Sequence, residues 1–158
     1  MNFRCVAMDT ETAKRFRTSG VDDCENRVRL MTATADTGYF CRHCLAQPGK
    51  GRQVLLASYD VGRPKGHYWS PSPVFICADD CRHFDPEGEI PPALRAVSLV
   101  NVRPYDAEER LLYDLNDVTT GDRLQPLLER ALADDRTDYL NIHTGRPGCF
   151  LCRVQRIA

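Results

Sequence analysis

The chain has 158 residues, of which 42% are hydrophobic and 27% are charged, and its formal net charge is −1. This composition is typical of a globular protein long enough to bury a core, and it argues against disordered, fibrous and coiled-coil classes. The near-zero charge provides no overall field that would attract nucleic acid or an anionic membrane. We therefore expect one domain over residues 1–158, with no pattern that indicates a nucleic-acid or membrane partner.

The first ten residues, MNFRCVAMDT, lack the apolar core of an export signal. No stretch of the sequence approaches the roughly 18 apolar residues of a membrane span. We therefore expect a cytoplasmic protein, in which the eight cysteines stay reduced. In that setting close cysteine pairs indicate metal or redox chemistry, whereas isolated cysteines act as small core residues.

Short segments of alternating apolar and polar residues, separated by turn residues, predict strands in the first half of the chain. One short helix is expected at Thr10–Thr18, with a threonine cap. The loop 40–51 is rich in Cys, His, Pro and Gly. The predicted strands of this half are Phe3–Met8, Val28–Ala33, Gln53–Tyr59 and Val74–Cys77.

The second half contains the one strong helical pattern, over about 121–134, because its leucines and one alanine recur at the spacing of a single helix face. Pro126 is tolerated only in a first turn, so the helix is expected to start between Gly121 and Gln125. Most connections are too short for parallel crossovers. The predicted fold is α+β, a mainly antiparallel sheet covered by one amphipathic helix. The predicted strands of this half are Arg95–Arg103, Leu111–Leu115, Tyr139–His143 and Cys149–Ile157.

The clearest chemical pattern is Cys41-Arg-His-Cys44 in the Gly-rich loop. Two cysteines at this spacing can place both thiolates on one Zn²⁺. The same spacing beside a βαβ unit would indicate a redox dithiol, but the sequence predicts no such unit. A plain structural loop is the third interpretation.

A zinc site needs two more ligands, and two segments can supply them. One runs from Cys77 through Cys81 to His83, at a loose spacing. The other is the C-terminal hairpin: if residues 144–148 form its loop, His143 lies opposite Cys149 on one face of the sheet. The preferred set is therefore the Cys₃His site Cys41, Cys44, Cys149 and His143, with Cys81 or His83 as substitutes.

Two other functions stay open. Without a metal, an imidazolium at His143 would lower the pKa of the Cys149 thiol and make a nucleophile, with Arg146 holding a small anionic substrate. The protein could also be a metal-free structural protein with reduced core cysteines. Cys152 is expected in the core in every case, because it shares the apolar face of the last strand.

Five short runs together resemble one family, the bacterial proteins catalogued as domain of unknown function 1203. The resemblance covers nearly the whole chain and implies a small cytosolic single-domain protein, without assigning an activity. Two positions depart from the family pattern: Ser72 stands where glycine is expected, and Pro104 interrupts a run that usually reads Arg-Ala-Tyr. The runs are Phe40-Cys-Arg-His-Cys-Leu45, Val54–Tyr59, Pro73-Val-Phe75, Arg103-Pro-Tyr-Asp106 and Gly148-Cys-Phe150 with Arg153.

Overall fold

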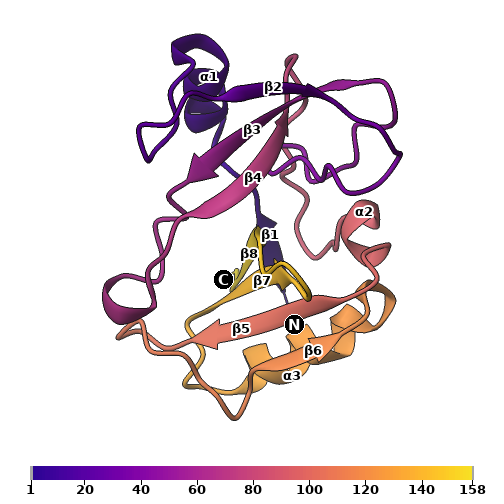
Figure 1. Cartoon of the computed structure of the whole chain (residues 1–158). Coiled ribbons are helices and arrows are strands. Elements are labelled where there is room, and N and C mark those ends of the chain that lie inside the picture. The colour runs from indigo at the N-terminus through magenta and orange to yellow at the C-terminus, as the bar shows by residue number, and fades with distance from the viewer. Residues whose placement is uncertain (1, 158) are drawn as a thin grey trace.

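The structure is a computed structural model and describes residues 2–157. It mixes α and β elements, with mainly antiparallel sheets and few helices (Figure 1). Within the described residues, no helix is both long and apolar enough to cross a membrane. The strands are β1 (Phe3–Val6), β2 (Arg29–Thr32), β3 (Gln53–Tyr59), β4 (Ser72–Cys77), β5 (Val100–Tyr105), β6 (Asp117–Thr119), β7 (Tyr139–Thr144) and β8 (Phe150–Arg156). The helices are α1 (Thr10–Ser19), α2 (Pro92–Arg95) and α3 (Leu124–Ala133), with 3₁₀ turns at Gly66–Tyr68 and Gly121–Arg123.

The strands form two sheets rather than the single sheet that the sequence predicts. A five-stranded sheet has the order β1-β8-β7-β5-β6, and a three-stranded sheet has the order β2-β3-β4. In Figure 1 the smaller sheet and α1 form the upper half of the molecule, and the larger sheet and α3 form the lower half. Local alternation predicts where strands lie but not which strands pair, so the division into two sheets was missed.

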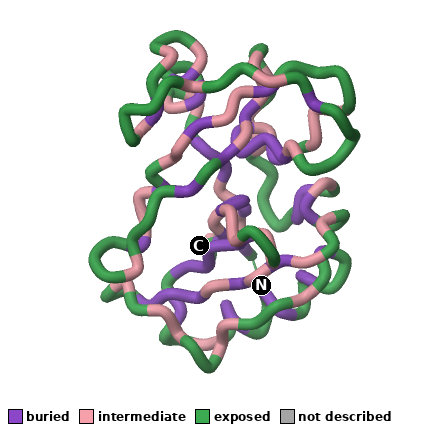
Figure 2. Tube along the Cα trace, viewed as in Figure 1, coloured by how far each residue is buried: buried purple, intermediate pink, exposed green. Residues whose placement is uncertain are grey.

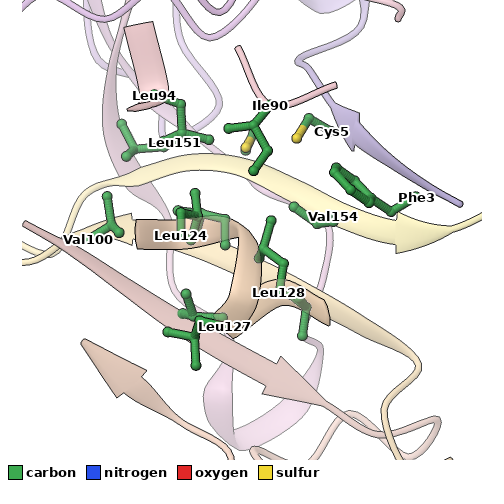
Figure 3. Close-up of a cluster of buried hydrophobic side chains, with 14 of the residues drawn as sticks. Phe3, Cys5, Ile90, Leu94, Val100, Leu124, Leu127, Leu128, Leu151 and Val154 are labelled. Atoms are coloured by element: carbon green, nitrogen blue, oxygen red, sulfur yellow. The ribbon is translucent and has the colours of Figure 1, made fainter. Parts of the chain in front are cut away.

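Helix α3 closes the core of the larger sheet. Its buried face consists of Leu124, Leu127, Leu128, Ala131 and Leu132, at the spacing that the sequence predicts. Figure 3 shows three of these leucines beside Val100 of β5 and Val154 of β8. Figure 2 shows that burial follows these central strands, whereas the outer loops are exposed.

Helix α1 packs on the smaller sheet through Ala13 and Phe16, both buried. It coincides with the predicted N-terminal helix, but the residue that caps it is Asp9, whose carboxylate accepts a hydrogen bond from the Thr12 amide. Cys41, at the start of the CxxC loop, belongs to the same buried cluster. The smaller sheet and α1 therefore form one side of the candidate site.

The predicted strand at Arg95–Arg103 is wrong over its first half. Pro92 opens the short helix α2 instead, and β5 begins only at Val100. The strand then continues through Pro104 to Tyr105. Pro104 stands opposite Leu140 of β7, but its carbonyl accepts from the Leu112 amide on the other side, so its nitrogen also points away from β7. On that side β6 pairs only with β5 residues up to Val102, so the missing N–H breaks no ladder hydrogen bond.

The predicted strand at Leu111–Leu115 is also wrong. Leu111 forms only an isolated bridge with Tyr105, and the amides of Leu115 and Asn116 both donate to the Leu112 carbonyl. These short-range hydrogen bonds make the segment a turn. The sixth strand follows it, at Asp117–Thr119.

The C-terminal hairpin has a β-bulge that the sequence analysis did not predict. Ile142 pairs with Cys152, but His143 pairs with Phe150, so Leu151 is the extra residue. His143 therefore lies opposite Phe150 and not opposite Cys149, and their rings meet edge to face at 5.8 Å. Cys152 is fully buried in the core, as predicted.

The α3 core face provides a stability test. Leu128→Ala removes a fully buried side chain and should lower the free energy of unfolding by about 2–5 kcal/mol in urea denaturation. The neighbouring exposed Glu129→Ala should change it by less than about 0.5 kcal/mol. Equal losses in the two variants would contradict the packing described here.

Candidate metal centre

The CxxC segment is a tight turn between the two sheets. The Leu45 amide donates to the Cys41 carbonyl at 2.9 Å, and Leu45 has a left-handed backbone with φ of 50°. Cys41 forms a parallel bridge with Phe75 of β4 and is fully buried, whereas Cys44 is half-buried. The turn thus holds one thiol in the core and one at its edge.

The second pair of cysteines comes from β4 and the loop that follows it. Cys77 is the last residue of β4, and its amide donates to the Cys41 sulfur at 3.2 Å. Cys81 follows four residues later. The sulfur atoms of Cys41, Cys44, Cys77 and Cys81 all lie within 4.8 Å of one another. We refer to these four residues as the thiol cluster.

The sulfur spacing fits a tetrahedral metal ion and not disulfides. The Sγ atoms of Cys41 and Cys81 are 3.9 Å apart, as are those of Cys44 and Cys77. A disulfide would need about 2.05 Å, and all eight cysteines are free. Four sulfurs at about 2.3 Å from a central Zn²⁺ would lie about 3.8 Å from each other in a regular tetrahedron. The cluster is therefore already spaced for one ion.

Polar groups around the cluster favour negatively charged sulfur. His43 Nδ1 lies 3.1 Å from the Cys81 sulfur, and its Nε2 lies 2.9 Å from the Thr10 hydroxyl. In the tautomer that satisfies both contacts, Nδ1–H donates to sulfur and Nε2 accepts from the hydroxyl. Arg17 reaches the same sulfur with Nη2 at 3.4 Å and donates to the Cys77 carbonyl at 3.1 Å. These contacts resemble the outer shell that orients and stabilises metal-bound ligands.

The thiols also shift each other's acidity. Hydrogen bonds from Cys44 and then Cys77 lower the pKa of Cys41 to about 6. The pKa of Cys81 is lowered as well, first through Cys41, while the pKa of Cys77 is raised, because its proton is held between neighbouring sulfurs. The pKa of Cys44 is raised too, first through Cys41. Two thiols of the cluster therefore give up their protons more easily than an ordinary cysteine and two less easily, and a bound cation would displace the protons that remain.

The comparisons with known proteins connect this geometry to one family. The family model described as protein of unknown function DUF1203 matches residues 38–156. The chain belongs to the DUF1203 family. The matched span contains all four members of the thiol cluster, whereas α1, which supplies Arg17 and Thr10, precedes it. No curated protein and no solved structure matches the chain.

In this DUF1203 protein, the other predicted site residues lie outside the thiol cluster. Among the described residues, the group of close metal-ligand atoms includes Cys41, Cys44 and Cys81 but not His143 or Cys149. The substitute His83 lies beside the cluster, with its ring 5.2 Å from that of His43, and offers no ligand atom to the group.

The hairpin residues line two cavities instead. His143 and Cys149 both line a cavity of about 210 Å³, and Cys149 and Arg146 line a larger one of about 520 Å³. His143 Nδ1 donates to the Gly148 carbonyl at 2.9 Å. Burial, and then the charge of Arg103, lower the pKa of His143 to about 4, so the ring is neutral at pH 7. A neutral ring does not supply the imidazolium that the thiol-enzyme hypothesis requires.

Cys77 is the member of the thiol cluster that the sequence analysis named neither in its preferred ligand set nor among the substitutes. The sequence does indicate Cys77, because Cys77 and Cys81 form a second close pair of cysteines in the chain. The hairpin was favoured over this pair because His143 was expected opposite Cys149, and the bulge removes that pairing.

The buried His143 predicts a pH dependence of stability. Its pKa is about 4 in the folded chain and about 6.5 in the unfolded chain, so the unfolded chain takes up the proton first as the pH falls. Stability is fully present above pH 6.5 and decreases toward pH 4. Between pH 7 and pH 4, wild type should lose about 2–3 kcal/mol more than His143→Asn, which keeps a donor for Gly148.

Urea denaturation at several pH values checks this difference. Acid release of any bound metal would lower the stability of both proteins, so it does not change the difference between them. The control is His67→Asn at an exposed histidine, which should follow the wild-type curve. Parallel curves for wild type and His143→Asn would contradict the prediction.

Proposed function

We propose that this DUF1203 protein binds one structural zinc ion through Cys41, Cys44, Cys77 and Cys81, and that the ion stabilises a binding module. The spacing of the four sulfurs carries the proposal, because it matches a tetrahedral S₄ site before any metal is placed. Sites built from four sulfurs select Zn²⁺ or iron over hard cations such as Mg²⁺ or Ca²⁺.

A structural role for the metal follows from the ligand count. Four protein thiolates fill a tetrahedral coordination shell, whereas catalytic zinc keeps one position open for water or substrate. A Zn²⁺ ion with four thiolates has a net charge of −2, and the nearby Arg17 guanidinium and the Cys77 amide offset part of it. This arrangement supports a closed site that holds loops together.

The position of the site explains what the ion would stabilise. Cys41 and Cys44 lie on the turn between the sheets, Cys77 ends β4, and Cys81 lies on the loop that follows it. The turn is buried through Phe40 and Leu45, whereas the loop after β4 is half-buried or exposed from Cys77 to Phe84 and has little burial to hold it. A shared ion would join them, and the binding free energy would add to the stability of the fold.

Metal content and thermal unfolding test the proposal together. Protein purified without chelator or a metal-affinity tag should contain about one zinc per chain. Cys44→Ser and Cys77→Ser should each lose the zinc and lower the Tm by more than about 10 °C, because a structural site contributes several kcal/mol to folding. A strong chelator should lower the Tm of wild type by a similar amount.

The matched control is Cys24→Ser, since Cys24 is an exposed cysteine away from the cluster. It should keep both the zinc and the wild-type Tm. The proposal fails if the cluster variants and wild type have the same Tm with and without chelator. If the purified protein contains iron instead of zinc, the four-cysteine metal site stands but the choice of zinc is wrong.

A further inference from the structure

A second site lies at the junction of the two sheets. A cavity of about 520 Å³ opens between the β3–β4 sheet, the segment after α2 and the hairpin loop before β8. We call it the junction cavity. Apolar side chains, among them Phe40, Phe75 and Leu99, form much of its wall. Its volume lies in the range of pockets that bind small organic molecules.

One buried cation faces this apolar space. Arg42 lines the cavity and is only 4% exposed. Its Nε donates to the Phe150 carbonyl at 2.7 Å, and its Nη1 donates to the Phe40 carbonyl. Among residues 2–157, Nη2 has no hydrogen-bond partner, yet it is not sealed off from solvent. One nitrogen of a fixed guanidinium, with its two N–H groups, is therefore free.

No carboxylate balances this charge. Within the described residues, Arg42 has no acidic side chain within 4.0 Å, and neither Asp nor Glu lines the junction cavity. Two surface arginines of this chain contrast with it: Arg110 pairs with Asp106, and Arg130 pairs with Asp117. A buried charge without a counter-ion is costly, so a site of this kind favours an anion.

Two further arginines raise the positive potential of the same region. Arg146 lies exposed on the cavity wall in the hairpin loop. Arg103 lines the adjoining cavity of about 210 Å³, which shares Pro73, Pro147 and Cys149 with the first and also has no acidic residue in its wall. Clefts lined by charges of one sign concentrate ligands of the opposite sign.

We propose that the junction cavity binds a small organic anion, a carboxylate with an apolar body, whose head group lies on Arg42 and whose body contacts Phe40, Phe75 and Leu99. The bound carboxylate accepts a charge-assisted hydrogen bond from Nη2 of Arg42, and Arg146 attracts it at the mouth. This inference rests on the proposed role as a binding module and names its ligand class. It does not depend on which metal fills the thiol cluster.

A matched pair of probes tests the head group and the body separately. 3-Phenylpropionate and 3-phenylpropanol share one apolar body and differ in the charged head. In a titration followed by ¹H–¹⁵N NMR, the carboxylate should cause saturable shifts at residues 96–99 and 144–149. The alcohol should bind at least tenfold more weakly.

Four variants locate the site. Arg42→Met should abolish binding of 3-phenylpropionate. Arg146→Ala should weaken it about threefold to tenfold, as expected for a partly screened charge. Ala96→Trp should block the cavity from an exposed position on its wall without removing any charge. The control Arg29→Ala removes an exposed arginine that does not line the cavity, and it should bind as wild type does.

If Arg42→Met fails to fold, Arg146→Ala and Ala96→Trp still decide the question. Equal affinity for the acid and the alcohol, unchanged binding in both of those variants, or no binding to wild type would each overturn the inference. Zinc is measured on the same samples, so the two proposals fail separately. Zinc without 3-phenylpropionate binding overturns only the ligand site, and binding without zinc overturns only the metal proposal.

Discussion

The turn at 41–45 is hydrogen-bonded to four separate parts of the chain, and the arrangement of both sites depends on it. Its backbone accepts from the amide of Met8, between β1 and α1, and donates to the carbonyl of Phe75 in β4. It also accepts from the amide of Phe84 in the loop after Cys81, and the Arg42 side chain donates to the first residue of β8. A buried turn must satisfy its polar backbone groups, and here that requirement connects the two sheets.

The same turn carries thiols on one side and a guanidinium on the other. On one side Cys41 and Cys44 belong to the thiol cluster, in which the pKa values of Cys41 and Cys81 are lowered and Arg17 lies beside the Cys81 sulfur. On the other side Arg42 carries a buried guanidinium into the junction cavity. Arg42 directly follows Cys41, and its side chain is held by the Phe150 and Phe40 carbonyls. The proposed metal centre and the proposed ligand site are thus adjacent in the chain through Cys41 and Arg42.

Local sequence patterns predicted where the helices and strands lie better than they predicted which distant segments contact each other. The α3 leucines and the bounds of β3 were predicted because a helix period and a confined apolar run are local signals. The CxxC half of the cluster was found for the same reason. The division into two sheets and the choice of Cys77 over His143 depend on contacts between distant segments. The bulge at Leu151 shows the difficulty, because one extra residue moved His143 away from Cys149.

X-ray absorption at the zinc edge of the purified protein tests the central claim most directly. The thiol cluster predicts about four sulfur neighbours at about 2.3 Å and no nitrogen or oxygen in the first shell. A first shell with about three sulfurs and one nitrogen would contradict the four-cysteine site and point back to a histidine ligand. A protein that binds no zinc, even after refolding with the metal, would show that the thiol cluster is part of a metal-free core.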